Sequence, residues 1–302
     1  MTDVSTVKTE RVLCVWRARS RGPIPVGSEE HKHLFCRMLL DTHDPYRPAV
    51  MEWPKLTAEE RARLVSLPIW NIAVQTEGRA KIRVLSFGEC LTDPLLKEAV
   101  MLNGFEEGRH KEVLSHMVAA YGIELASEPP YLRPRDVEGA FLLTGYSECV
   151  DSFFAFGLFE LAKRSGFFPL ALVDTFEPVM QEECRHILFF TNWVYWHRKN
   201  LPIWKRALFD ARRLAVFVRL VLERLETARD VGGGDNFAMT GHESMGIEIG
   251  LVGLMSTCLK ENERRMSRYD ERLLRPTFMP RLVRVALFFV RSRKNAPTQE
   301  GI

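Results

Sequence analysis

The sequence is poor in several features that would assign a protein to a specialised class. Its 302 residues include six cysteines, and none of them forms a Cys-x-x-Cys pair. The scattered spacing argues against a zinc ribbon or a rubredoxin-type iron site, whose ligands come in such pairs. Cysteines without a disulfide framework indicate reduced thiols, so we expect a cytoplasmic protein.

Long apolar runs, a leader and a strong charge bias are lacking as well. No stretch reaches the roughly 18–20 apolar residues that a membrane-spanning helix needs. The first residues, Met-Thr-Asp-Val-Ser-Thr, show neither the basic start nor the apolar run of a secretory signal. The net charge of +3 is too small to indicate nucleic-acid binding, so no nucleic-acid partner is expected.

One string of five residues occurs twice in the chain. Residues 106–110 and residues 182–186 both read Glu-Glu-x-Arg-His. Each copy contains Glu-x-x-His, which puts a carboxylate and an imidazole one turn apart on the same helix face. A single Glu-x-x-His is close to chance in a chain of this length, whereas two copies of the longer string are not. The plain alternative is a pair of solvated helix faces with ion pairs, but the same stripes carry apolar residues that a bundle would bury.

Helical periodicity predicts four long helices that carry these strings. They span about residues 68–90, 94–117, 136–164 and 169–199. Asp93-Pro94 is a good N-cap and first-turn pair for the second helix, and Ser165-Gly166 ends the third. Pro178 is predicted to kink the fourth helix one turn before Glu183.

Three regions follow from this pattern. Residues 1–55 are rich in proline and glycine and predict an irregular N-terminal extension with one short helix near 29–40. Residues 56–200 hold the four-helix region, which opens with a capping box at Thr57-Ala-Glu-Glu60. Residues 201–302 predict a helical C-terminal extension packed on the bundle, with helices near 203–229, 243–267 and 280–293 and a glycine loop at 232–234.

Hairpin geometry supplies two further ligands. In an antiparallel helix pair, residues equidistant from the turn lie at the same height. Glu77 and Glu107 are equidistant from Thr92-Asp93, so they should face one another. Glu148 and Glu183 are equidistant from Ser165-Gly166 in the same way. Glu89 would lie at the first turn itself, while Glu160 and Glu138 would centre the second turn inside helical segments. The predicted ligand set is Glu77, Glu107, His110, Glu148, Glu183 and His186.

Four carboxylates and two imidazoles define the chemistry of such a site. Oxygen ligands with one imidazole per metal suit iron or manganese better than zinc or copper, which favour more nitrogen or sulfur. We therefore expect two iron ions, with manganese or a mixed manganese–iron pair left open. The coordination positions that the protein does not fill are available to dioxygen or peroxide.

With these motifs the chain resembles the ferritin-like di-iron carboxylate superfamily. Its acid-Glu-x-Arg-His form is similar to that of bacterial multicomponent monooxygenase hydroxylases and acyl-carrier-protein desaturases. Its ligand intervals of 30, 41 and 35 residues look more like those of rubrerythrins and demethoxyubiquinone hydroxylases. The resemblance covers about residues 68–199 and identifies no subfamily.

The resemblance implies an all-α fold, a ferritin-like four-helix bundle with extra N- and C-terminal helices. It implies that Glu107 and Glu183 bridge the two metal ions. The terminal ligands would be Glu77 with His110 and Glu148 with His186. Four outer residues would hold the imidazoles by hydrogen bonds: Glu106, Arg109, Glu182 and Arg185. Ordinary surface charge is the alternative explanation for the two arginines.

The function expected from this resemblance is a non-haem di-iron oxidase or oxygenase. It would use dioxygen to hydroxylate, desaturate or N-oxygenate a small apolar organic substrate. Electrons would come from an external donor such as a ferredoxin or a reductase. Two alternatives stay open: an iron-handling or peroxide-scavenging protein of the ferritin or rubrerythrin type, and a metal-free helical interaction protein.

Further polar and aromatic candidates lie on the third predicted helix. Asp151 and Ser152, one turn beyond Glu148, are candidates for proton delivery, although ordinary helix polarity explains them equally well. Five phenylalanines between residues 141 and 159 either line an apolar substrate pocket or simply fill the core.

The C-terminal segment is strongly basic. Between Arg272 and Gln299 there are six arginines and one lysine but no acidic residue. A helix over residues 278–294 therefore either covers the bundle or lies on an anionic membrane, at its inner face. The sequence also leaves a homodimer open.

Overall fold

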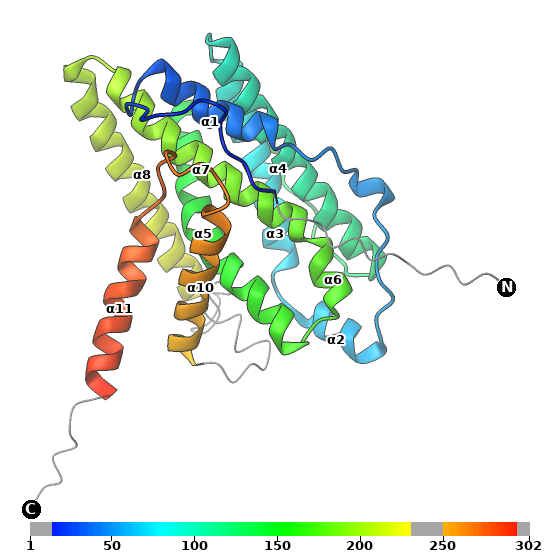
Figure 1. Ribbon diagram of the computed structural model, residues 1–302. Coiled ribbons are helices and arrows are strands. Elements are labelled where there is room, and N and C mark those ends of the chain that lie inside the picture. The colour runs from blue at the N-terminus through cyan, green and yellow to red at the C-terminus, as the bar shows by residue number, and fades with distance from the viewer. Residues whose placement is uncertain (1–13, 231–249, 295–302) are drawn as a thin grey trace, which may run out of the picture.

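The computed structural model describes residues 14–230 and 250–294 (Figure 1). Every regular element in these two ranges is a helix, so the all-α prediction is confirmed for them. The predicted glycine loop at 232–234 and the first residues of the helix predicted over 243–267 lie outside the described ranges.

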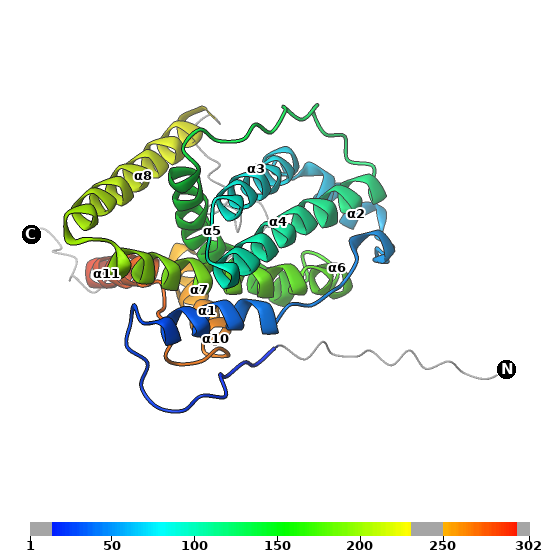
Figure 2. The same ribbon diagram turned by 90° about the horizontal axis from the view of Figure 1, so that it is seen from above.

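Four long helices form the centre of the molecule. α3 (Trp70–Glu89) turns back into α4 (Pro94–Ala120). α5 (Val137–Ser165) leads through α6 (Leu170–Thr175) to α7 (Glu177–Asn200). α3 packs along α4, α5 packs against both α3 and α7, and α4 touches α7, so the four helices enclose a common interior (Figure 2).

The two central turns form where local sequence signals predict them. Asp93 Oδ1 accepts a hydrogen bond from Leu96 N at 3.0 Å, with Pro94 in the first turn of α4. At the second turn, Gly166 ends α5 with φ of 65°, a left-handed conformation that glycine adopts without strain. Both turns therefore bring their helices back beside each other as the hairpin geometry requires.

The prediction for the fourth helix is wrong in one respect. The segment after Pro169 is not one helix kinked at Pro178, because α6 ends at Thr175 and α7 begins at Glu177. Phe176, with φ of −91° and ψ of −3°, is the junction between them. Pro178 lies in the first turn of α7, where its missing N–H leaves no hydrogen bond unmade.

The remaining helices wrap these four. The N-terminal region contributes α1 (Glu29–Asp41), a 3₁₀ turn (Pro48–Val50) and α2 (Ala58–Ser66), whose predicted capping box between Thr57 and Glu60 is present. α1 packs against α7 and α4. The C-terminal region contributes α8 (Ile203–Asp230), α10 (Leu251–Met266) and α11 (Phe278–Lys294). α8 and α10 pack on α5, and α11 packs on α10 and α5.

The core is continuous across these regions. Phe35, Met38 and Leu39 of α1 are fully buried in the same hydrophobic cluster as residues of α4, α5 and α7. The five phenylalanines of α5 are divided between this cluster and a second one that α5 shares with α10 and α11. Phe141, Phe153 and Phe156 are buried core residues, and Phe154 and Phe159 are partly buried against the second cluster. None of the six cysteines is in a disulfide, and none of the described helices combines the length and apolar character needed to cross a membrane.

Candidate metal centre

The two Glu-x-x-His pairs meet in the interior between α4 and α7. Glu107 and His110 come from α4, and Glu183 and His186 come from α7. One ligand atom of each lies within 4.8 Å of the corresponding atoms of the other three, and all four residues are buried. The imidazole rings are tilted by 33° with centroids 5.6 Å apart. This arrangement could hold a metal ion.

Two more glutamates border this cluster from the other helices. Glu77 of α3 has a carboxylate oxygen 3.7 Å from His110 Nδ1. Glu148 of α5 interacts electrostatically with Glu107 and Glu183. The structure thus brings four of the six predicted ligands into one cluster, with Glu77 and Glu148 beside it, and each hairpin contributes two of the four glutamates.

The competing glutamates are engaged elsewhere. Glu160 pairs with Arg164 one turn along α5, with an N–O distance of 2.6 Å. Glu138 pairs with Arg212 of α8 at 2.8 Å, and Glu89 pairs with Arg133. The sequence-based choice of Glu148 over these residues agrees with their positions.

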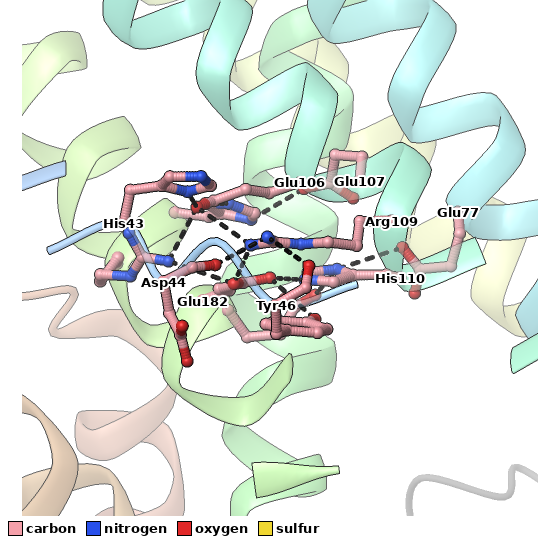
Figure 3. Close-up of polar contacts among 12 residues, drawn as sticks. His43, Asp44, Tyr46, Glu77, Glu106, Glu107, Arg109, His110 and Glu182 are labelled. Atoms are coloured by element: carbon pink, nitrogen blue, oxygen red, sulfur yellow. Dashed lines mark hydrogen bonds and ion pairs between the residues drawn. The ribbon is translucent and has the colours of Figure 1, made fainter. Parts of the chain in front are cut away.

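Each histidine makes its outer hydrogen bond to the first glutamate of the other motif. His110 Nε2, from the first motif, donates to Glu182 Oε2 of the second at 2.9 Å. His186 Nε2, from the second, donates to Glu106 Oε2 of the first at 2.8 Å. Figure 3 shows Glu106 and Glu182 in this role. Because Nε2 carries the donated proton in each ring, Nδ1 is the atom that faces the cluster.

The motif arginines complete a buried ion network behind the imidazoles. Arg109 pairs with Glu182 of the other motif, and Arg185 donates to Glu106 at 2.9 Å. Both arginines are at most 3% exposed. They are therefore not surface charges, and each balances a carboxylate that would be costly to bury alone.

A short N-terminal segment, residues 42–46, closes this side of the site. His43 Nδ1 lies 2.7 Å from Glu106 Oε1, and the Tyr46 hydroxyl donates to Glu182 Oε2 at 3.3 Å (Figure 3). Arg109 donates to the backbone carbonyl of Asp44 at 2.7 Å and lies over the Tyr46 ring, 4.0 Å from its centroid. Sequence reasoning missed these residues, since they lie in a proline-rich segment without periodicity.

Three buried atoms at the centre of the cluster have no hydrogen-bond partner: Glu107 Oε1, His110 Nδ1 and His186 Nδ1. His186 Nδ1 lies 2.8 Å from Glu107 Oε1, yet the two atoms are not aligned as donor and acceptor. Buried polar atoms are rarely left unpaired in proteins. His110 Nδ1 likewise lies 3.2 Å from Glu183 Oε1 without a hydrogen bond to it. Polar atoms that converge in this way are suited to a bound metal ion, which would displace any proton from the two Nδ1 atoms.

The electrostatics of the site point the same way. Burial raises the pKa of Glu77 to about 8. Hydrogen bonding by His110 opposes this shift, while the charges of Glu107 and Glu183 add to it. Burial likewise raises the pKa of Glu148. Although burial opposes it, the charge of Glu107 and the bond from Glu106 raise the pKa of His186 to about 10. Without metal, the site therefore holds protons that bound cations would displace.

The charges of the site also favour the binding of cations. Six carboxylates surround the two imidazoles: Glu77, Glu106, Glu107, Glu148, Glu182 and Glu183. Two guanidinium groups, Arg109 and Arg185, balance two of them. With neutral imidazoles, four negative charges are left over, and two divalent cations would neutralise them.

The two candidates for proton delivery lie differently. Ser152 is buried, and its hydroxyl donates to Glu183 Oε2 at 2.9 Å. Asp151 is partly exposed and accepts a hydrogen bond from Ser147 Oγ at 2.9 Å, one turn earlier on α5. Ser152 is thus in direct contact with a predicted ligand.

Fold and site together define an all-α protein with a buried glutamate–histidine cluster able to hold metal. In comparisons with known proteins, no family model, no curated protein and no solved structure matches this chain.

Proposed function

We propose that this protein is a non-haem di-iron oxidase or oxygenase built on a ferritin-like four-helix bundle. One observation carries the proposal: two Glu/His pairs from α4 and α7 converge, and three of their buried atoms, Glu107 Oε1, His110 Nδ1 and His186 Nδ1, have no hydrogen-bond partner. Each imidazole is backed by a carboxylate from the opposite helix. In di-iron carboxylate bundles, two helices supply Glu-x-x-His and the other two supply one glutamate each. Glu77 on α3 and Glu148 on α5 complete that pattern in this chain.

In this proposal Glu107 and Glu183, with His110, His186, Glu77 and Glu148, would hold the two ions. A pair of ferrous ions, when bound, supplies electrons to dioxygen and lets it oxidise an organic molecule. In a hydroxylation, one oxygen atom of dioxygen would enter the substrate and the other would leave as water, which takes two electrons from an external donor and two protons from solvent. The protein's own task is to hold the ions, to exclude water and to place protons.

The structure offers these residues distinct positions for that task. The side bounded by residues 42–46 is closed by His43, Tyr46 and the buried arginines. Of the predicted ligands, Glu77 on α3 has a side chain that is 20% exposed, and Glu148 on α5 is partly exposed as well. Dioxygen and a small apolar substrate would therefore approach between α3 and α5. Ser152 would hold a proton at Glu183 Oε2.

Metal content is the direct test of this proposal. Protein produced in iron-rich medium should contain about two iron ions per chain by elemental analysis, because the ligand set and its excess charge call for two. The iron-loaded protein, reduced without air and then exposed to dioxygen, should consume it and oxidise members of a panel of lipids and amines. Manganese in place of iron would change the cofactor but keep the site. Less than about half an equivalent of any transition metal after reconstitution would leave the metal-free interaction protein as the better interpretation.

A further inference from the structure

α11 is held on the body of the protein by one apolar stripe. Met279, Val283 and Leu287 recur at every fourth position and are at most 6% exposed. They belong to the hydrophobic cluster that α11 shares with α5 and α10. This inward stripe already provides the apolar face that an ordinary surface helix needs.

A second apolar stripe on the same helix faces solvent. Phe278, Leu282, Val285 and Phe289 follow one another at helical spacing, so they share one face of α11. Their exposed fractions are 51%, 50%, 53% and 61%. Single exposed apolar residues are ordinary, but four large ones in a row form the kind of patch that marks a contact surface.

α8 extends this patch sideways. The rings of Phe217 on α8 and Phe278 on α11 are in contact, with centroids 4.8 Å apart. Leu214 and Val221, roughly one turn before and after Phe217, are 65% and 43% exposed. Both views place α8 and α11 at the same edge of the molecule (Figures 1 and 2). We call this patch the α8–α11 face: Leu214, Val221, Phe278, Leu282, Val285 and Phe289.

The charge that α11 brings to this face has one sign, whereas the acidic Glu223 beside Val221 on α8 is paired with Arg219. From Phe278 to Lys294 the sequence has four arginines and one lysine but no acidic residue. Arg281 and Arg284 are exposed, and within residues 14–230 and 250–294 no carboxylate is paired with either. A second copy of the chain would bring like charges together at α11. A surface that combines an apolar layer with negative charge would match both properties.

We propose that the α8–α11 face docks on an anionic phospholipid membrane. The phenylalanine and leucine side chains enter the boundary between headgroups and acyl chains, while Arg281 and Arg284 extend to the lipid phosphates. Contact is peripheral, since α11 is amphipathic and no described helix can cross a bilayer. The proposal does not depend on the metal centre, which lies in the interior between α4 and α7.

Vesicle co-sedimentation of the full chain tests this proposal. The protein should bind vesicles of phosphatidylcholine with roughly one third phosphatidylglycerol, weakly bind pure phosphatidylcholine, and dissociate as salt rises. The double variant Leu282→Ser/Phe289→Ser should bind the anionic vesicles about tenfold or more weakly, because it removes two inserted side chains. Arg281→Glu/Arg284→Glu should lose a similar factor through repulsion by the phosphates.

Matched controls come from exposed residues on other helices and loops. Ile72→Ser replaces an α3 residue with 55% exposure, and Lys97→Glu/Arg135→Glu reverses two exposed charges elsewhere. Both controls should bind like the unmodified protein, with unchanged circular dichroism. Equal binding by all variants, or no binding to anionic vesicles, would overturn the proposal. If Leu282→Ser/Phe289→Ser instead dissociates a dimer in a protein that binds no vesicles, the face joins two copies and the membrane proposal is wrong. Running metal-free and iron-loaded protein side by side keeps this result separate from the metal assignment.

Discussion

Each imidazole of the cluster depends on a carboxylate from the other motif. Glu182 accepts the proton of His110 Nε2 and is itself paired with Arg109. This contact fixes the His110 ring so that Nδ1 faces the cluster. A neutral glutamine amide at position 182 would hold the ring less firmly. We predict that Glu182→Gln lowers iron affinity by about 10–100-fold, measured by competition with a chelator. Glu112→Gln, an exposed change two residues beyond His110, is the control and should keep full affinity. Equal affinity in the two variants would show that Glu182 does not prepare His110 for metal binding.

Glu148 and Glu160 lie on the same helix but in different surroundings. Glu148 interacts with Glu107 and Glu183 at the cluster, whereas Glu160 pairs with Arg164. We predict that Glu148→Ala retains at most about one iron ion per chain, because one metal loses a carboxylate ligand. Glu160→Ala should retain two and lose at most about 0.5–1 kcal/mol of stability with its exposed ion pair. Elemental analysis of both variants decides the matter, and the reverse pattern would mean that the hairpin pairing is misassigned.

Eight Glu, Arg and His residues of the two motifs and the two partner glutamates, Glu77 and Glu148, could be selected from sequence. Helical spacing fixes which of these residues share a helix face. A repeat on two helices, and equal distance from two turns, place side chains without any knowledge of the rest. His43 and Tyr46 could not be found this way. His43 contacts Glu106 across 63 residues of sequence, and nothing in an irregular segment fixes which side chains turn inward.

At the scale of helices, α5 and α10 approach each other unusually closely. A Cβ atom added to Gly157 of α5 would lie 2.3 Å from Cys258 Sγ and 3.0 Å from the Cys258 backbone. The backbone cannot yield without moving α10. We predict that Gly157→Ala destabilises the protein by about 1–3 kcal/mol in urea unfolding. Gly250→Ala, where the new Cβ has open space, is the control for this contact and should cost only about 0.5 kcal/mol, the loss from replacing the N-cap glycine of α10 by alanine. A neutral Gly157→Ala would show that the two helices can separate freely.

Asp270 joins the turn after α10 to the N-terminal segment. It accepts hydrogen bonds from Arg272 Nη2 at 2.7 Å and from Ala18 N at 2.9 Å. The bond from Arg272 is the main reason that the pKa of Asp270 falls to about 2, despite burial. A lowered carboxyl pKa adds stability that is present above pH ~4 and lost as the pH falls toward ~2.

The lowered pKa of Asp270 predicts how the stability of the Asp270→Asn variant changes with pH. The variant should be about 1–2 kcal/mol less stable than the parent at pH 7, and the difference should shrink between pH 4 and pH 2. Urea unfolding at several pH values measures it. Glu271→Gln, an exposed neighbour, should track the parent throughout. A difference that stays constant down to pH 2 would assign the loss to packing rather than to the charge.

Helix existence and helix ends were predictable to different degrees. Asp93-Pro94, Thr57-Glu60 and Ser165-Gly166 are local signals whose physics is complete within a few residues, and the structure has all three. The break at Phe176 was not predictable from Pro178, because proline is compatible with both a kink and a first turn. The packing of α6 beside α5 and α7 selects the second outcome.

For the whole molecule, the sequence predicts the all-α class but not how the terminal regions pack on the four central helices. The N-terminal region reads as an irregular extension with one short helix, yet α1 supplies fully buried core residues and the segment after it closes one side of the candidate metal site. Such contacts join residues far apart in the chain: 63 positions separate His43 from Glu106, and 146 separate Arg185 from Leu39, whose carbonyl accepts from Arg185 at 3.2 Å. The pairing of these distant residues is set by how whole helices pack together, and no local sequence pattern predicts that packing.

The last prediction separates an oxygenase from an iron-storing protein. Storage requires that oxidised iron leave the site and make room for more, so its ligands must be open to a wet interior. In this protein the side chains of His110, His186 and Glu107 are at most 1% exposed, and a layer of charged and aromatic residues closes one side. We predict that, in air with a large excess of ferrous iron, oxidation stops near the two ions that the site holds. Absorbance of ferric iron and size-exclusion chromatography with iron analysis measure the extent. Catalytic oxidation far beyond two ions, with a soluble core retained by the protein, would replace the oxygenase with a ferritin-like function. Rapid consumption of hydrogen peroxide instead of dioxygen would favour a rubrerythrin-like peroxidase. We expect neither, because ligands held this tightly from both helices retain their ions between turnovers and direct the oxidising equivalents to a bound substrate.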